Sequence, residues 1–212
     1  MTSPLARVNV RADWWETLWS FAHRVLAVNL LLALAGAPLM LALSLVATPW
    51  RYPIFFGLLA LPLAPATAAA FAYYADDDPR PPLRLLFRLV KARGRRSLLI
   101  GVAAAALIGV LAADLKVLAA SFPAAVPPLV VLMLIVAVSA LNALAGATVR
   151  LAIYSGVRGW GLSLLSLAVL AAVVVIVSQA PLAGLATLPG CALWVVFTNA
   201  QAQLTRITRR TG

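Results

Sequence analysis

The chain has 212 residues, of which 64% are hydrophobic and only 11% are charged, and its mean hydropathy is +1.00. A soluble domain is about half apolar and about a quarter charged, so this composition excludes an ordinary water-soluble fold. The net charge of +11 would suggest nucleic acid as a partner in a soluble protein. Here the basic residues are confined to loops and ends, which favours anionic lipid and excludes nucleic acid.

The first predicted element is an amphipathic helix at residues 13–24. Trp14, Trp15 and Trp19 are typical of the headgroup layer, where an indole ring can be half buried and half hydrogen-bonded. This helix either lies on the inner membrane surface or simply extends the first spanning helix into the cytoplasm.

Six stretches are apolar over about the 20 residues that a helix needs to cross a bilayer. In chain order they cover 25–47, 54–74, 98 to a point between 113 and 121, 126–149, 160–177 and 182–204. They predict an all-α fold, an integral membrane six-helix bundle, with 1–212 forming a single multi-pass membrane domain.

The basic residues predict the orientation of this bundle. Fifteen of the seventeen lie in the two terminal segments and in the second and fourth loops, whereas only Arg51 and Lys116 fall on the other side. Because basic loops stay in the cytoplasm, both termini and the loop at 80–96 are predicted to be cytoplasmic. We expect the bacterial cell (inner) membrane as the location.

The loop between the second and third spans is predicted to form a cytoplasmic amphipathic helix. Two faces are evident in the sequence: an apolar one of Leu83, Leu86, Phe87 and Val90, and a basic one of Arg84, Arg88, Lys91 and Arg95. Such helices commonly bind anionic lipid, and they also dock in grooves of partner proteins. The sequence leaves both alternatives open.

Interior prolines interrupt three spans: Pro38 in the first, Pro62 and Pro65 in the second, and Pro189 in the sixth. Each leaves the carbonyl four residues earlier without its usual partner, and Thr67 is a local hydroxyl that can donate to such a carbonyl. Broken helices near the midplane are typical of transporter sites, although membrane prolines commonly only bend a helix.

Two asparagines, Asn29 and Asn142, lie inside spans. They are expected to hydrogen-bond across helices or to line a solute pathway. With Pro62, Pro65 and Thr67 they form the candidate substrate-binding set.

The third span carries small residues at every fourth position, namely Gly101, Ala105, Gly109 and Ala113. Such a stripe lets another backbone approach closely. We predict that it packs against a helix of the same chain or forms the seam of a homodimer.

Chemistry-bearing residues are scarce. Cys191 is the single cysteine and His23 the single histidine, so neither a disulfide nor a metal cluster is expected. Paired carboxylates within a span, a Gly-rich phosphate loop and a Ser–His arrangement are all missing from the sequence. We expect no enzyme activity, no catalytic residues, no metal and no cofactor.

Several short motifs between residues 29 and 118 carry a family resemblance. They are Val-Asn-Leu-Leu at 28–31, Pro-Ala-Thr-Ala-Ala at 65–69, an acidic turn at 76–78, Leu-Leu-Phe-Arg at 85–88 and Ala-Asp-Leu at 113–115. This pattern resembles the YesL family of bacterial integral membrane proteins, a domain of unknown function.

The resemblance implies an accessory or permease-like component of solute (carbohydrate) uptake, with ABC transporter subunits and the lipid bilayer as partners. The alternative is a stand-alone small-molecule channel or carrier with a pathway lined by the candidate substrate-binding set.

Overall fold

The computed structural model describes residues 10–48, 51–76, 82–179 and 181–211, and within these ranges it contains helices and no strand. The prediction of an all-α fold is confirmed. The helices are α1 (Val10–Leu45), α2 (Pro53–Ala60), α3 (Leu63–Tyr74), α4 (Pro82–Ser121), the 3₁₀ helix η2 (Pro123–Ala125), α5 (Val126–Leu144), α6 (Val149–Arg158), α7 (Trp160–Gln179) and α8 (Pro181–Thr211).

Five segments of the described chain are long and apolar enough to cross a membrane. They are Leu18–Leu45, Pro53–Tyr74, Leu83–Ala119, Pro123–Leu144 and Trp160–Val177, and they contain the first five predicted spans or most of each. The sixth predicted span, 182–204, lies within α8, and the side chains of its first five residues lie outside the described part. The count of six spans stays a prediction.

Residues 13–24 continue directly into the first span as part of α1. Trp14, Trp15 and Trp19 are exposed along this extension. Of the two alternatives, the helix that extends the first span therefore matches the backbone, because no break separates the turns with the tryptophans from the apolar turns.

The second predicted span is divided into α2 and α3 at Leu61 and Pro62. Pro62 and Pro65 cannot donate to Leu58 and Leu61, and both carbonyls instead accept from a backbone N–H three residues on. Leu61 N donates to Leu58 O at 3.2 Å and Ala64 N donates to Leu61 O at 3.2 Å. The break is thus a tightened turn in which both carbonyls have a donor.

The predicted amphipathic helix and the predicted third span form one continuous helix, α4, of 40 residues. At 1.5 Å per residue it is about 60 Å long. Gly94 lies between the two parts, and an interior glycine costs only about 1 kcal/mol, which neighbouring contacts offset. The basic part of α4 is consequently continuous with the apolar part.

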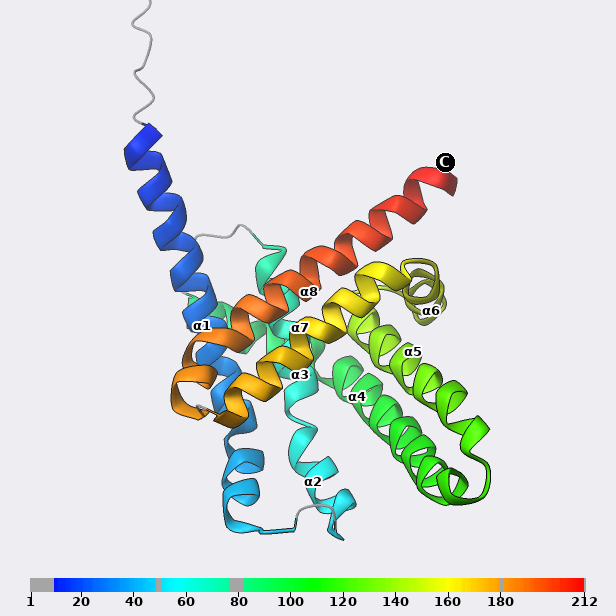
Figure 1. Ribbon diagram of the computed structural model, residues 1–212. Coiled ribbons are helices and arrows are strands. Elements are labelled where there is room, and N and C mark those ends of the chain that lie inside the picture. The colour runs from blue at the N-terminus through cyan, green and yellow to red at the C-terminus, as the bar shows by residue number, and fades with distance from the viewer. Residues whose placement is uncertain (1–9, 49–50, 77–81, 180, 212) are drawn as a thin grey trace, which may run out of the picture.

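The buried core lies toward one end of the bundle, which we call the basic end: the end with α6, the first turns of α4 and the last turns of α8 (Figure 1). Val28, Phe71, Leu86 and Val196 are almost fully buried there. At the opposite, far end, with α2 and the α4–α5 turn, α2 buries no residue. Leu111 is the one buried side chain described in α4 beyond Ser97.

A short helix, α6, occupies the fourth loop, where the sequence analysis placed no element. The chain reaches it through a Schellman turn, in which Gly146 has a φ of +110°. Gly146 N donates to Ala143 O and Ala147 N donates to Asn142 O, each at 3.2 Å, which satisfies the end of α5. This turn directs α6 across the basic end, where it buries Ala152 against its neighbours.

Candidate functional site

A buried polar seam joins four helices at the basic end. Asn142 of α5 is 3% exposed and donates through Nδ2 to Ser155 Oγ of α6 at 3.0 Å and to Gln203 Oε1 of α8 at 3.2 Å. Ala152 O lies 3.4 Å from the same nitrogen. These contacts connect three elements through one amide, which needs such partners in an apolar surrounding.

Gln203 extends the seam to α7. Its Nε2 donates to Ser163 Oγ at 3.3 Å, and Ser163 in turn donates to Gly156 O at 2.9 Å. A Cβ on Gly159 would lie 2.9 Å from Gln203 Cγ and Cδ, so the glycine makes room for the glutamine. One turn of α8 earlier, Asn199 donates to Ser166 Oγ at 3.0 Å.

A second polar contact joins α1 to α8 at Pro189 and Gly190. Asn29 Oδ1 accepts from Gly190 N at 2.6 Å, and Tyr74 of α3 donates to Gly190 O at 2.9 Å. A Cβ at Gly190 would lie 2.8 Å from Val25 O, so α1 and α8 touch through backbone here. Three helices therefore meet at one glycine.

The candidate substrate-binding set is not brought together as one site. Asn29 contacts α8 at Gly190 and Asn142 contacts it at Gln203, thirteen residues or about 20 Å further along the helix. Thr67 donates to Leu63 O of its own helix at 2.8 Å. Pro62 is exposed and Pro65 half-buried. The two asparagines make the interhelical hydrogen bonds that were one of their predicted roles.

In the predicted amphipathic helix at the start of α4, the buried and exposed faces differ in part from those that the sequence pattern predicts. Its basic residues Arg84, Arg88, Lys91 and Arg95 are exposed as expected. Of the apolar residues, Leu86 is 1% exposed and Val90 half-buried, whereas Leu83 and Phe87 are 44% and 60% exposed. Leu85, which the pattern did not single out, is buried in the core, because α4 turns the Leu85–Leu86 edge toward it.

The small-residue stripe is used at one end. A Cβ on Gly101 would lie 2.5 Å from Ala64 Cβ, so α3 packs directly on this glycine. Ala105, Gly109 and Ala113 are exposed, and a Cβ on Gly109 would have no described atom within 4 Å. The stripe packs within the chain at Gly101, and the homodimer seam stays a prediction for the turns at Ala105, Gly109 and Ala113.

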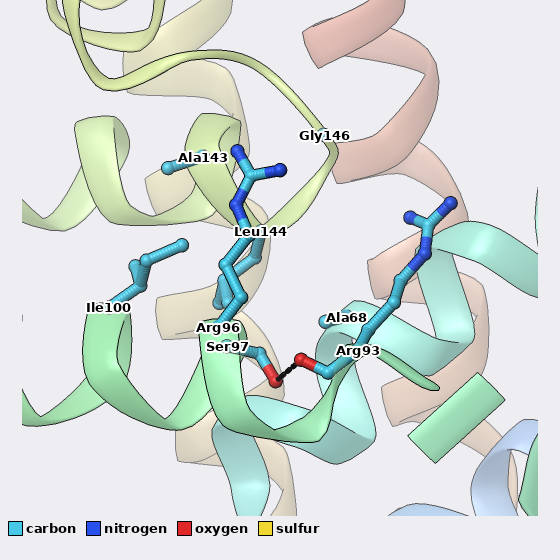
Figure 2. A pocket seen from close by; sticks show the side chains of 8 residues that line it. All are labelled: Ala68, Arg93, Arg96, Ser97, Ile100, Ala143, Leu144 and Gly146. Atoms are coloured by element: carbon cyan, nitrogen blue, oxygen red, sulfur yellow. Dashed lines mark hydrogen bonds between the residues drawn. The ribbon is translucent and has the colours of Figure 1, made fainter. Parts of the chain in front are cut away.

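A cavity of about 220 Å³ opens beside the polar seam, between α3, α4 and the end of α5. It is lined by Ala68, Arg93, Arg96, Ser97, Ile100, Ala143, Leu144 and Gly146 (Figure 2). Arg96 Nη2 donates to Ala147 O at 3.0 Å, which ties α4 to the Schellman turn. Ser97 Oγ donates to Arg93 O at 2.8 Å, so its hydroxyl proton is already used.

Sequence reasoning treated Arg93 and Arg96 only as residues that orient the chain. Their spacing of three places them on one face of a helix, which is a signal visible in the sequence. The carbonyl that holds Arg96 is 51 residues away, and no local pattern connects the two positions.

No group of three or more metal-ligating side chains occurs among the described residues. Comparison with protein families, with curated proteins and with solved structures finds no match for this chain, so the resemblance to the YesL family stays a prediction.

Proposed function

We propose that this chain is a six-span protein of the bacterial inner membrane, with both termini in the cytoplasm, and that it assists solute uptake. In this role it is an accessory or permease-like component that binds subunits of an ABC transporter. The observation that carries the proposal is the geometry of the first turns of α4. One edge is held in the core by Leu85 and Leu86, while a row of basic side chains faces away from it.

This geometry suits a docking surface because the helix is held against the core and its basic side chains are exposed. A partner with an acidic cytoplasmic surface would meet the row on a helix that is already formed, which lowers the backbone entropy lost on binding. Leu83 and Phe87 are exposed next to the row and add apolar contact area.

The contacts inside the bundle favour an accessory role over a stand-alone carrier. A carrier needs polar groups that are available to solute near the midplane. Asn29 and Asn142 are buried and hydrogen-bonded to protein, and the carbonyls released by Pro62 and Pro65 accept from backbone N–H groups. The two asparagines stabilise contacts between helices, and the two carbonyls already have donors within the α2–α3 turn.

Reversing the charge of the basic row tests the proposal. The triple variant Arg84→Glu, Arg88→Glu and Lys91→Glu should lower co-purification of ABC permease or ATPase subunits by about tenfold or more, because three attractions become repulsions. The measurement is quantitative mass spectrometry of partners captured with the tagged protein from cross-linked membranes.

A matched control reverses three other exposed basic residues of the same end, in Arg150→Glu, Arg158→Glu and Arg206→Glu. It carries the same charge change away from α4 and should retain the partner. Equal retention by both variants, with unchanged membrane insertion, would contradict the proposal. Solute flux through liposomes that contain only the purified protein would favour the carrier instead.

The orientation has a separate test in a Cys191→Ser background. Arg95→Cys at the basic end should react with a membrane-impermeant maleimide only after the cells are opened, whereas Lys116→Cys at the far end should react in intact cells. Both residues are exposed, so accessibility depends on the side of the membrane. The opposite pattern would overturn the placement of both termini.

A further inference from the structure

The cavity beside the polar seam combines two guanidinium groups with an apolar floor. Arg93 and Arg96 lie about one turn apart on α4, and in Figure 2 their guanidinium groups end on either side of Gly146, with that of Arg96 beside Ala143. Ile100, Leu144 and Ala68 line it on the side toward the core. A small volume that is basic at its mouth and apolar at its base fits a ligand with an anionic group joined to an apolar part.

The arginines keep donors that the protein does not use. A guanidinium carries five N–H donors, and Arg96 commits one nitrogen to Ala147 O. That bond fixes the position of the side chain and leaves its other donors available. The guanidinium group of Arg93 has no hydrogen bond or ion pair within the described ranges, although its backbone carbonyl accepts from Ser97. The whole chain has six acidic residues against seventeen basic ones, so internal neutralisation is incomplete.

The ligand that this cavity fits is a phosphate group. Arginine forks match the paired oxygens of phosphate, and a phosphate placed between the two guanidinium groups would be attracted by both. The volume of about 220 Å³ is below the roughly 300 Å³ at which sites for drug-sized ligands begin. It accommodates a headgroup-sized anion and leaves long chains outside.

We propose that Arg93 and Arg96 bind the phosphate of an anionic phospholipid headgroup in this cavity. The apolar part of α4 begins at Leu98, directly after Ser97, so under the proposed membrane placement the two arginines lie at the level of the lipid phosphates. Ile100 and Leu144 then contact the carbon atoms of the headgroup glycerol, and the acyl chains stay outside the cavity. A zwitterionic lipid binds less well because its own cation repels the guanidinium groups.

Native mass spectrometry of the purified protein in mild detergent, with added phosphatidylglycerol or phosphatidylcholine, tests this proposal. Wild type should bind phosphatidylglycerol about tenfold more tightly than phosphatidylcholine. Arg93→Gln and Arg96→Gln should each weaken phosphatidylglycerol binding by about tenfold, which corresponds to one charge-assisted hydrogen bond. Arg93→Gln is the safer variant for folding because Arg96 also holds the Schellman turn.

Arg95→Gln is the matched control, since it removes one exposed positive charge from the same turn but does not line the cavity. It should change binding by about twofold or less. Arg93→Lys keeps the positive charge but lacks the paired N–H donors of a guanidinium group. Its affinity for phosphatidylglycerol should fall between those of wild type and Arg93→Gln. Equal effects of Arg93→Gln and Arg95→Gln, or equal binding of both lipids by wild type, would overturn the proposal.

Competition with soluble phosphate compounds distinguishes a lipid headgroup from a free phosphate as the ligand. If the lipid is the ligand, glycerol 3-phosphate and inorganic phosphate at millimolar concentration should displace little of it. Efficient displacement would assign the cavity to a soluble phosphate compound and overturn the lipid assignment. The lipid measurement uses no transporter subunit, so it can succeed or fail independently of partner binding through Arg84, Arg88 and Lys91.

Discussion

The basic end and the far end of this bundle differ in burial. At the basic end, Phe71, Leu86 and Val196 are almost fully buried, and a hydrogen-bonded seam ties four helices together. At the far end α2 buries no residue and the α4–α5 hairpin is largely exposed. In lipid, a leucine gains little by leaving the acyl chains, so close packing concentrates where glycines and polar groups allow specific contacts.

Gly101 and Gly109 belong to the same small-residue stripe of α4, and substituting each one compares packing near the two ends of the bundle. Gly101→Val should lower the free energy of unfolding by about 3 kcal/mol, because its Cβ would meet Ala64 Cβ and the two backbones must separate. Gly109→Val, with open space around it, should change stability by less than about 0.5 kcal/mol. Unfolding in mixed detergent micelles measures both values, and similar losses would show that the far half of α4 is also packed.

Two leucines on the same helix sharpen the comparison. Leu86→Ala removes a side chain that is 1% exposed and should cost about 2 kcal/mol, since it leaves a cavity in the core. Leu107→Ala removes one that is 47% exposed and should cost less than about 0.5 kcal/mol, because lipid fills the space. The same micelle titration reads both variants. A larger loss for Leu107→Ala would indicate a further helix or a second copy on that face.

The smallest effect concerns hydrogen bonding in the seam. Asn142→Ala and Gln203→Ala should show a coupling of about 1 kcal/mol in a double-mutant cycle, because each amide is a partner of the other. A coupling near zero would show that this hydrogen bond does not stabilise the bundle.

Ser139 lies about one turn toward the far end, and its buried hydroxyl has no hydrogen-bond partner among the described residues. Ser139→Ala should therefore leave the free energy of unfolding unchanged or raise it by up to about 1 kcal/mol.

Much of the fold could be predicted because it depends on local signals. Apolar stretches of sufficient length marked the helices, and Pro62 marked the break between α2 and α3. The sequence pattern does not predict the continuity of α4, since Gly94 and the basic residues near it are typical of a separate element in the loop before the span. Helix α6 was also missed, because the predicted fourth span, 126–149, reaches its first residue and only ten residues separate that span from the next.

By itself, the sequence determined that this chain is helical, largely apolar and strongly asymmetric in charge, because these properties follow from residue types and their order. Tertiary structure alone decided which polar groups meet: Asn29 with Gly190, Asn142 with Gln203, and Arg96 with Ala147. These partners lie 161, 61 and 51 residues apart, and no local pattern encodes such pairs. They form because a polar group in an apolar bundle must find a donor or acceptor on whichever helix packs beside it.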